Sequence, residues 1–230
     1  MKWAEFAEYC YKKGKGTPWN FDGWLGEMLF KEGTEWRLRF GKVKKIIEKI
    51  NKINPLCCVL DLMCGGAYPS RWLAEQQPQC FVVGIDLDRK ALLFAKKRIK
   101  KGVDNLDFVR CDVHMLPFKG KIADLTLAIG GLEYVDLKEV LSEVKRVTKK
   151  WFVATFTGEK FKRKLHYKLG LVHLRFIFNS KLPRVFKPEE VKQILAFLSE
   201  ENTIYECGEY NLIAYANLTT YDAEQHANSF

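Results

Sequence analysis

Short apolar runs alternate with helical patterns between residues 57 and 157, and this alternation constrains the fold of the chain more than any other feature. Consecutive strands joined by helices run parallel, because a parallel pair needs a long crossover connection. A parallel sheet is covered on both faces, so its strands are continuously apolar. The pattern therefore predicts an α/β fold with a doubly wound sheet. The predicted parallel strands cover residues 57–62, 80–86, 106–111, 124–129 and 151–156.

The chain continues with a helix opened by Pro188 and two further strands, at 203–207 and 212–218. Only four residues separate these strands, which permits a hairpin but no parallel crossover. We therefore expect seven strands, mostly parallel, with an antiparallel C-terminal hairpin. Other helices are expected at 43–53, at 69–77, after Asp88 and after Asp136. Glu139 lies three residues after Asp136, as in a capping box.

The chain divides into three expected parts. Residues 1–56 form an N-terminal helical arm, whose first 40 residues are rich in aromatics and broken by glycines into short helices and turns. Residues 57–218 form the core, and residues 219–230 form a C-terminal tail. The segment 158–187 is a basic insertion in the core, with nine Lys or Arg and one acidic residue.

Composition excludes several classes of protein. With 47% hydrophobic and 29% charged residues, the chain is expected to be a soluble globule rather than a disordered or collagen-like one. No apolar run approaches the ~20 residues of a membrane-spanning helix, and the N-terminus lacks the apolar stretch of a secretory signal. The seven cysteines include no C-x-x-C pair and the four histidines are scattered, so we expect reduced thiols, no metal and a cytoplasmic location.

Acidic residues or glycines follow four strands of the predicted sheet. Asp61 lies at the end of the first strand and Gly65 follows it, Asp86 ends the second strand, Asp112 follows the third and Gly130 the fourth. Turns favour these residue types in any protein, but ligands of open parallel sheets bind at this edge. An acid about 20 residues after a glycine turn suits the hydroxyls of a ribose.

The same residues select among nucleotide ligands. A dinucleotide site uses G-x-G-x-x-G to bring a helix N-terminus to a pyrophosphate, and this chain has only Gly65-Gly66. Asp61 would repel a pyrophosphate and attract a cation. S-adenosylmethionine carries a sulfonium, an ammonium and a ribose but no phosphate, so it is the favoured ligand.

Five segments together resemble a known family. Residues 59–67 (VLDLMCGGA) resemble the first motif of class I, Rossmann-like, S-adenosylmethionine-dependent methyltransferases, usually hhDhGxGxG. Residues 83–88 (VGIDLD) and 108–118 (FVRCDVHMLPF) are similar to the second and third motifs. Residues 123–135 are similar to the fourth-strand block, and 143–147 (EVKRV) to the helix before strand five. The resemblance is to the methyltransferase-domain-11 group and covers residues 40–157 and 188–218.

The resemblance implies a cofactor, S-adenosyl-L-methionine, and a set of residues around it. Asp61, Cys64 and Gly65 would lie at its aminocarboxypropyl end, and Asp86 would bind the ribose hydroxyls. Leu87 would pack on the adenine, Asp112 and Val113 would contact its edge, and Ile129 and Gly130 would line the floor. Trp19 of the N-terminal arm would stack near the sulfonium, or else lie in the core.

Two positions depart from the family motif, because Met63 and Ala67 stand where glycine is usual. We expect Ala67 to be tolerated if its φ stays negative, and Met63 to narrow the space beside the methionine portion of the ligand.

Two other functions stay open: an NAD(P)-dependent oxidoreductase on a similar sheet, and a partner protein that binds a cofactor or nucleic acid without turnover.

The basic insertion is expected to enclose the acceptor. As a helix it would carry a basic face (Lys160, Lys164, Lys168, Arg175) and an apolar face (Leu165, Leu169, Val172, Phe176). An RNA, an anionic small molecule or an anionic membrane surface would suit the basic face, and solvated lysines are the alternative. Candidate bases by position are Glu133, Tyr134, His166 and His173, but no catalytic residue is assigned.

Overall fold

The computed structural model of the chain describes residues 32–158, 184–207 and 211–219. These residues form a seven-stranded sheet in the order β3-β2-β1-β4-β5-β7-β6. Strands β1 to β5 pair in parallel, whereas β7 pairs antiparallel with both β5 and β6. The predicted fold class is therefore confirmed. The strands are β1 (Cys58–Leu62), β2 (Phe81–Asp86), β3 (Leu106–Arg110), β4 (Ala123–Ile129), β5 (Thr148–Thr157), β6 (Asn202–Cys207) and β7 (Asn211–Asn217).

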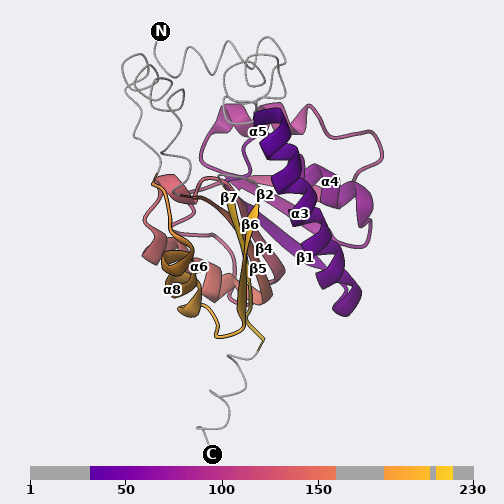
Figure 1. The fold of residues 1–230 in the computed structure, drawn as a ribbon. Helices are drawn as coiled ribbons and strands as arrows, with labels where there is room; N and C mark the ends of the chain where they lie inside the picture. Colours follow the sequence, from indigo (N-terminus) through magenta and orange to yellow (C-terminus); the bar gives the residue numbers. More distant parts are fainter. Residues whose placement is uncertain (1–31, 159–183, 208–210, 220–230) are drawn as a thin grey trace, which may run out of the picture.

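Helices cover both faces of the sheet (Figure 1). One layer contains α3 (Glu32–Ile53), α4 (Tyr68–Gln76) and α5 (Arg89–Lys96), and the other contains α6 (Leu137–Val147) and α8 (Pro188–Ala196). A short 3-10 helix, η1 (Leu132–Tyr134), follows β4. The strand order reverses between β1 and β4, which places the switch point of the sheet at their carboxyl ends.

Helix α3 begins earlier than its apolar spacing predicted. It starts at Glu32, so the last part of the aromatic N-terminal region is one long helix rather than short helices and turns. Its Phe40, Val43 and Ile47 are buried in one cluster with strand residues of β1 and β2. The arm expected to end at residue 56 therefore shares its core with the sheet from Phe40 onward.

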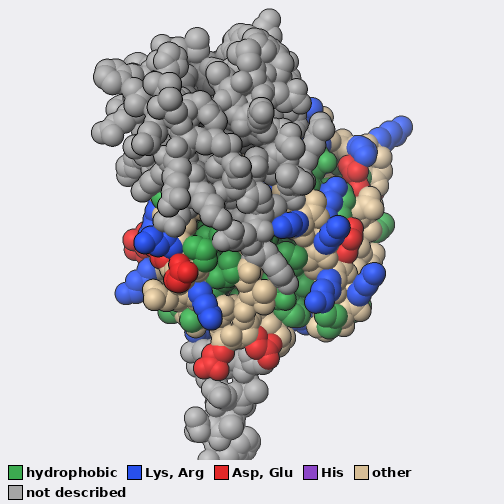
Figure 2. Space-filling model, in the orientation of Figure 1, with side chains coloured by type: hydrophobic (Ala, Val, Ile, Leu, Met, Phe, Trp, Pro, Cys, Tyr) green, Lys and Arg blue, Asp and Glu red, His purple; other side chains and the backbone are tan. Residues whose placement is uncertain are grey.

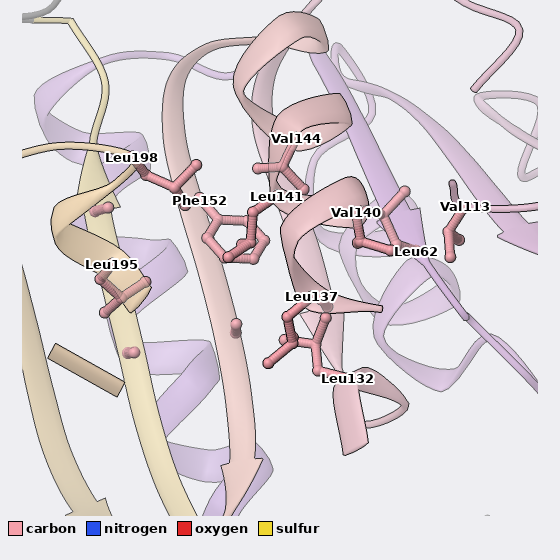
Figure 3. Packing of buried hydrophobic residues seen from close by; sticks show 14 of the residues in the cluster. Leu62, Val113, Leu132, Leu137, Val140, Leu141, Val144, Phe152, Leu195 and Leu198 are labelled. Atoms are coloured by element: carbon pink, nitrogen blue, oxygen red, sulfur yellow. The ribbon is translucent and has the colours of Figure 1, made fainter. Parts of the chain in front are cut away.

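The core on the other face forms where α6 and α8 pack on the sheet (Figure 3). Leu137, Leu141 and Val144 of α6 lie against Phe152 of β5, and Leu195 of α8 is fully buried beside them. The apolar residues of α6 recur at helical spacing and so share this face of the helix. Burial of such side chains is the main favourable contribution to folding.

Capping residues fix where two helices begin. Asp88 accepts a hydrogen bond from Lys90 N at 2.8 Å, and Asp136 accepts one from Lys138 N at 3.0 Å. The capping-box expectation is wrong in its second half, because the N–H of Asp136 donates to His114 Nε2 at 3.2 Å rather than to Glu139. A histidine distant in sequence thus replaces the local partner.

Gly84 of β2 is required by a close contact with β3. A Cβ on Gly84 would lie 2.6 Å from Phe108 Cδ1 and 3.1 Å from Cys64 Sγ. We expect Gly84→Ala to lower the free energy of unfolding by about 1–3 kcal/mol, since the core must shift to accept the methyl group. Urea unfolding followed by circular dichroism measures the change.

Gly41 of α3 provides the matched control, because a Cβ there would meet no atom within 4 Å. Gly41→Ala is expected to raise the free energy of unfolding by up to about 1 kcal/mol, as alanine is the better helix former. Equal effects of the two substitutions would show that the Phe108 contact does not determine the residue at position 84.

Candidate cofactor site

The carboxyl ends of β3, β2, β1 and β4 lie side by side at one edge of the sheet. This arrangement gathers every predicted site residue that the structure describes. They are Asp61, Cys64, Gly65, Asp86, Leu87, Asp112, Val113, Ile129 and Gly130. Trp19, His166 and His173 lie outside the described residues, as do residues 159–183 of the basic insertion.

The loop from β1 to α4 is a tight turn held to β2. Cys64 N donates to Ile85 O at 2.9 Å, and Ala67 N donates to Cys64 O at 2.7 Å. Gly65 lies between them with a φ of 51°. The Cys64 side chain is buried, and burial raises the pKa of its thiol well above the ordinary value. Cys64 is therefore a packing residue and not a nucleophile.

The two departures from the family motif keep a glycine-like backbone. Met63 has a φ of 54° and Ala67 a φ of 53°, both in the left-handed region. The condition under which Ala67 was expected to be tolerated, a negative φ, is therefore not met. The left-handed conformation costs an L-residue about 1–2 kcal/mol, which the surrounding hydrogen bonds and packing must offset.

Asp86 connects the end of β2 to this loop. Its Oδ2 accepts a hydrogen bond from Gly65 N at 2.7 Å, and its Oδ1 accepts one from Asp88 N at 2.8 Å. Partial burial raises the pKa of its carboxyl, while these backbone donors oppose the rise. Each oxygen keeps a second lone pair, so the carboxylate can accept two more hydrogen bonds, as a vicinal diol would supply.

Asp61 lies beneath the loop, with 1% of its surface exposed. Ser70 Oγ donates to its Oδ2 at 2.5 Å. Burial raises the pKa of Asp61 to about 7. Asp61 therefore contacts the first turn of α4 from below, through Ser70. The sequence reasoning missed Ser70, although its place in the first turn of α4, three residues before Leu73, puts it on the buried helix face.

Asp112 and His114 form a second polar group, after β3. Asp112 Oδ1 accepts from His114 N at 3.0 Å and lies 2.5 Å from His114 Nδ1. These hydrogen bonds lower the pKa of Asp112. Because His114 Nε2 accepts from Asp136 N, its Nδ1 carries the proton and donates to Asp112. The Asp112 side chain remains about half exposed, so its Oδ2 can accept a ligand donor.

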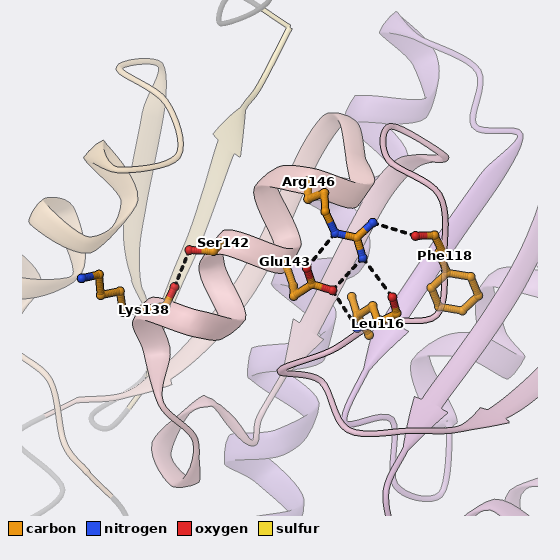
Figure 4. A network of polar contacts seen from close by, with 6 residues as sticks. All are labelled: Leu116, Phe118, Lys138, Ser142, Glu143 and Arg146. Carbon is orange, nitrogen blue, oxygen red and sulfur yellow. Dashed lines mark hydrogen bonds and ion pairs between the residues drawn. The ribbon is translucent and has the colours of Figure 1, made fainter.

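Helix α6 supports the loop that carries Asp112 and Val113 (Figure 4). Arg146 donates from Nη1 to Phe118 O at 2.7 Å and from Nη2 to Leu116 O at 2.9 Å. Its guanidinium also pairs with Glu143, which accepts from Leu116 N at 2.7 Å. The hydrogen bond from Arg146 lowers the pKa of Glu143. The EVKRV segment that resembled the family thus positions the third motif.

Two glycines with positive φ, Gly130 and Gly131, follow β4 at this edge of the sheet, and we call this pair the floor of the edge. Gly130 has a φ of 90° and Gly131 a φ of 100°. A Cβ on Gly131 would lie 2.7 Å from Met63 Sδ, whereas a Cβ on Gly130 would meet nothing within 4 Å. Met63 therefore packs against Gly131 at the switch point, and Gly130 leaves room for a ligand.

Glu133 connects this floor to the segments on either side of the basic insertion. Its Oε2 accepts from Gly131 N at 2.9 Å, and its Oε1 accepts from Thr157 N at 2.9 Å and Thr157 Oγ1 at 2.7 Å. Its carbonyl accepts from Arg184 N at 3.2 Å. The carboxylate is buried and already satisfied by three donors, which favours a positioning role over that of a general base.

Glu133→Gln is expected to lower the free energy of unfolding by about 2–3 kcal/mol, because the amide NH2 faces a buried N–H that needs an acceptor. Glu139→Gln is the matched control, since Glu139 is exposed and should change stability by less than about 0.5 kcal/mol. Urea unfolding of both variants measures the difference. A Glu133→Gln variant as stable as the control would contradict the connecting role of Glu133.

Within the described residues, no group of three His, Cys, Asp or Glu side chains could hold a metal ion. In the same residues, no helix combines the length and the apolar character needed to cross a bilayer.

Comparisons with known proteins identify the core. Residues 59–151 match the family model described as a methyltransferase domain. The chain is 35% identical over 124 residues to a demethylmenaquinone methyltransferase of Thermotoga maritima, covering 54% of this chain and 49% of that protein. It is 28% identical over 110 residues to the ubiquinone/menaquinone biosynthesis C-methyltransferase UbiE of Wigglesworthia glossinidia brevipalpis, covering 46% and 44%. The chain thus spans about half the length of these curated relatives.

A solved structure gives the same result for the fold. The crystal structure of a SAM-dependent methyltransferase from Aquifex aeolicus aligns with a TM-score of 0.59 at 18% identity, covering 79% of this chain and 92% of that one. The order of strands, the acids at their ends and the matched family model agree with one another. Residues 59–151 of this chain therefore form a methyltransferase domain of the class I S-adenosylmethionine-dependent family.

Proposed function

We propose that the chain transfers a methyl group from S-adenosylmethionine to a reduced quinone, that is, to the hydroquinone ring of a lipid-soluble acceptor. The observation that carries the methyl-transfer part is Asp86, whose two oxygens each bind one backbone N–H and keep a lone pair for a ribose hydroxyl. The names of the two curated relatives support the acceptor class. The family match gives no support to the NAD(P)-dependent oxidoreductase.

The residues at the sheet edge fit the cofactor by their chemistry. Asp86 would hold the ribose, and Leu87, 60% exposed, offers an apolar surface for the adenine. Asp112 would accept from the adenine amine. Asp61 would favour the cationic end from beneath the loop, and Gly130 leaves the floor open. When bound, S-adenosylmethionine supplies an electrophilic methyl group on a good leaving group.

The contribution of the chain to catalysis is then alignment and exclusion of water. A hydroquinone must give up a hydroxyl proton before its ring becomes a strong nucleophile, so a nearby acceptor for that proton would help. Glu133 is unsuited because three donors already occupy its carboxylate. Tyr134 is exposed at the same edge, so its side chain is better placed to contact the bound hydroquinone.

The basic insertion remains our candidate for the acceptor side of the site. The described residues at its two ends are joined, because Gly158 and Phe186 form a bridge and Phe186 N donates to Thr157 O at 2.9 Å. Both ends lie beside Glu133 and thus beside the floor of the edge. An anionic small molecule or an RNA, the acceptors favoured by its charge alone, are the competing outcomes.

Transfer of labelled methyl from S-adenosylmethionine tests the proposal. The purified chain would be incubated with a reduced short-chain demethylmenaquinone, with total RNA and with a pool of acidic metabolites. We expect label in the quinone fraction. The amount of label should be lower when the quinone is supplied in its oxidised form, because the oxidised ring is electron-poor. Label in RNA or in the metabolite pool would reject the quinone while keeping methyl transfer, and no label in any pool would reject the function.

A further inference from the structure

Histidine occurs once in the part of the chain that the structure describes, as His114. The face drawn in Figure 2 displays Lys and Arg side chains among its described residues, but no histidine is visible there. His114 follows β3, in the loop that also carries Asp112, and 28% of its side chain is exposed. It is assigned no contact with the cofactor, yet it lies beside the acid that is assigned to the adenine.

Both ring nitrogens of His114 are occupied. Its Nδ1 lies 2.5 Å from Asp112 Oδ1, and its Nε2 accepts a hydrogen bond from Asp136 N at 3.2 Å. Asp136 caps helix α6, whose Leu137 and Val140 are buried in the core. The imidazole therefore fixes the position of the Asp112 carboxylate relative to a helix that is itself held by packing.

The two oxygens of Asp112 have different surroundings. Oδ1 accepts hydrogen bonds from His114 N at 3.0 Å and from the Nδ1–H of the same residue. Within the described residues no donor contacts Oδ2, and 53% of the Asp112 side chain is exposed. Because Oδ1 is already held, little side-chain rotation remains to be frozen when Oδ2 binds a ligand donor.

A carboxylate in this position distinguishes between purine bases. The exocyclic amine of adenine donates hydrogen bonds, whereas hypoxanthine carries a carbonyl oxygen at the same place. The amine can bind the carboxylate, but the carbonyl would leave it without a donor and add repulsion between oxygens. This discrimination requires a carboxylate that stays in place, because one that turns away neither binds the amine nor excludes the carbonyl.

We propose that His114 is a positioning residue that sets the selectivity of the cofactor site for adenine. Its imidazole holds Asp112 Oδ1, so that Oδ2 meets the amine of the base. The inference rests on the proposed placement of the adenine at Asp112 and is independent of the methyl acceptor. It therefore survives if the acceptor is not a quinone.

Isothermal titration with two ligands measures this selectivity without any methyl transfer. The ligands are S-adenosylhomocysteine and S-inosylhomocysteine, which share the ribose and the homocysteine portion and differ only in the base. We expect the original chain to bind the adenosyl ligand about a hundredfold more tightly, because a hydrogen bond to a charged group is lost with the other. Equal affinities would overturn the proposal, and the labelled-methyl assay would still report on the proposed function.

His114→Gln and His114→Asn separate the two contacts of the ring. The amide oxygen of glutamine takes the place of Nε2 and can accept from Asp136 N, but no donor is left for Asp112 Oδ1 at the place of Nδ1. The amide nitrogen of asparagine takes the place of Nδ1 and can donate to Asp112. We expect His114→Gln to lower the preference for the adenosyl ligand roughly three- to tenfold, and His114→Asn to keep it within about twofold.

Asp86→Asn is the comparison for a residue that contacts the shared ribose, and it should weaken binding of both ligands by the same factor. Thermal melting shows which variants are folded, and the preference of the original chain needs no variant. A preference that His114→Gln leaves unchanged would overturn the role of His114. An equal loss of preference in the Gln and Asn variants of His114 would overturn it too, because asparagine keeps the donor to Asp112.

Discussion

Asparagine in place of Asp86 is expected to weaken binding of S-adenosylhomocysteine about a hundredfold. The substitution keeps the shape of the side chain but turns one acceptor oxygen into a donor and removes the charge. A ribose hydroxyl would lose a charge-assisted hydrogen bond, and Gly65 N–H or Asp88 N–H would lose its acceptor. The loss of the backbone contact affects the free and the bound protein alike, whereas the charge-assisted hydrogen bonds to the ribose exist only in the complex. Their loss amounts to about 3 kcal/mol, which corresponds to about a hundredfold in affinity.

Isothermal titration calorimetry measures the affinity, with Asp104→Asn as the control. Asp104 is exposed, lies before β3 and makes none of these contacts, so its variant should bind within about twofold of the original chain. Melting temperatures of the two variants show whether the loop has unfolded. An Asp86→Asn variant that binds as tightly as the control would mean that the ribose lies elsewhere.

Asp61→Asn is expected to remove a pH dependence of stability. Burial raises the pKa of Asp61 from 3.8 to about 7. Between these pH values the folded chain keeps a proton that the unfolded chain has released, so folding becomes less favourable as pH rises. The contribution of Asp61 to stability is fully present below about pH 4 and is lost as pH rises through about 7, a loss of a few kcal/mol.

Urea unfolding at a series of pH values measures this effect as a difference between the two proteins. Asparagine can still accept from Ser70 and does not ionise, so the variant gains on the original chain by a few kcal/mol between about pH 4 and pH 8. Asp104→Asn, at an exposed position, should show a much smaller change over the same range. A stability difference between Asp61→Asn and the original chain that stays constant across this range would contradict an Asp61 protonated near neutral pH.

The strands and the packed helices could be predicted because burial leaves its trace in the order of residues. Val59 to Leu62 and Leu125 to Ala128 are mostly apolar and buried at every position, because both faces of the sheet are covered. The helix after Asp136 shows its buried face at helical spacing. The edge of the site could be predicted for a related reason. Parallel strands all end at the same edge, so acids that follow separate strands meet there.

Backbone conformation and distant partners could not be predicted in the same way. Apolar periodicity carries no information about φ, so the left-handed Met63 and Ala67 are visible only in the structure. Glycines at 33 and 41 concealed the length of α3, because glycine is a poor helix former in any sequence pattern. Glu133 and Thr157 are 24 residues apart, and nothing local in the sequence marks them as partners.

The same limit explains the wrong capping partner at Asp136. The local pattern offered Glu139, but His114 competes for the same N–H and is held in place by Asp112. A tertiary contact thus decides between two partners that are locally equivalent.

A crystal structure of the chain with S-adenosylhomocysteine tests the assigned site most directly. We expect the nucleoside at the carboxyl ends of β1, β2, β3 and β4, with both ribose hydroxyls about 2.6–3.0 Å from the Asp86 carboxylate. A nucleoside bound away from this edge, or an Asp86 side chain turned away from the ribose, would contradict this assignment.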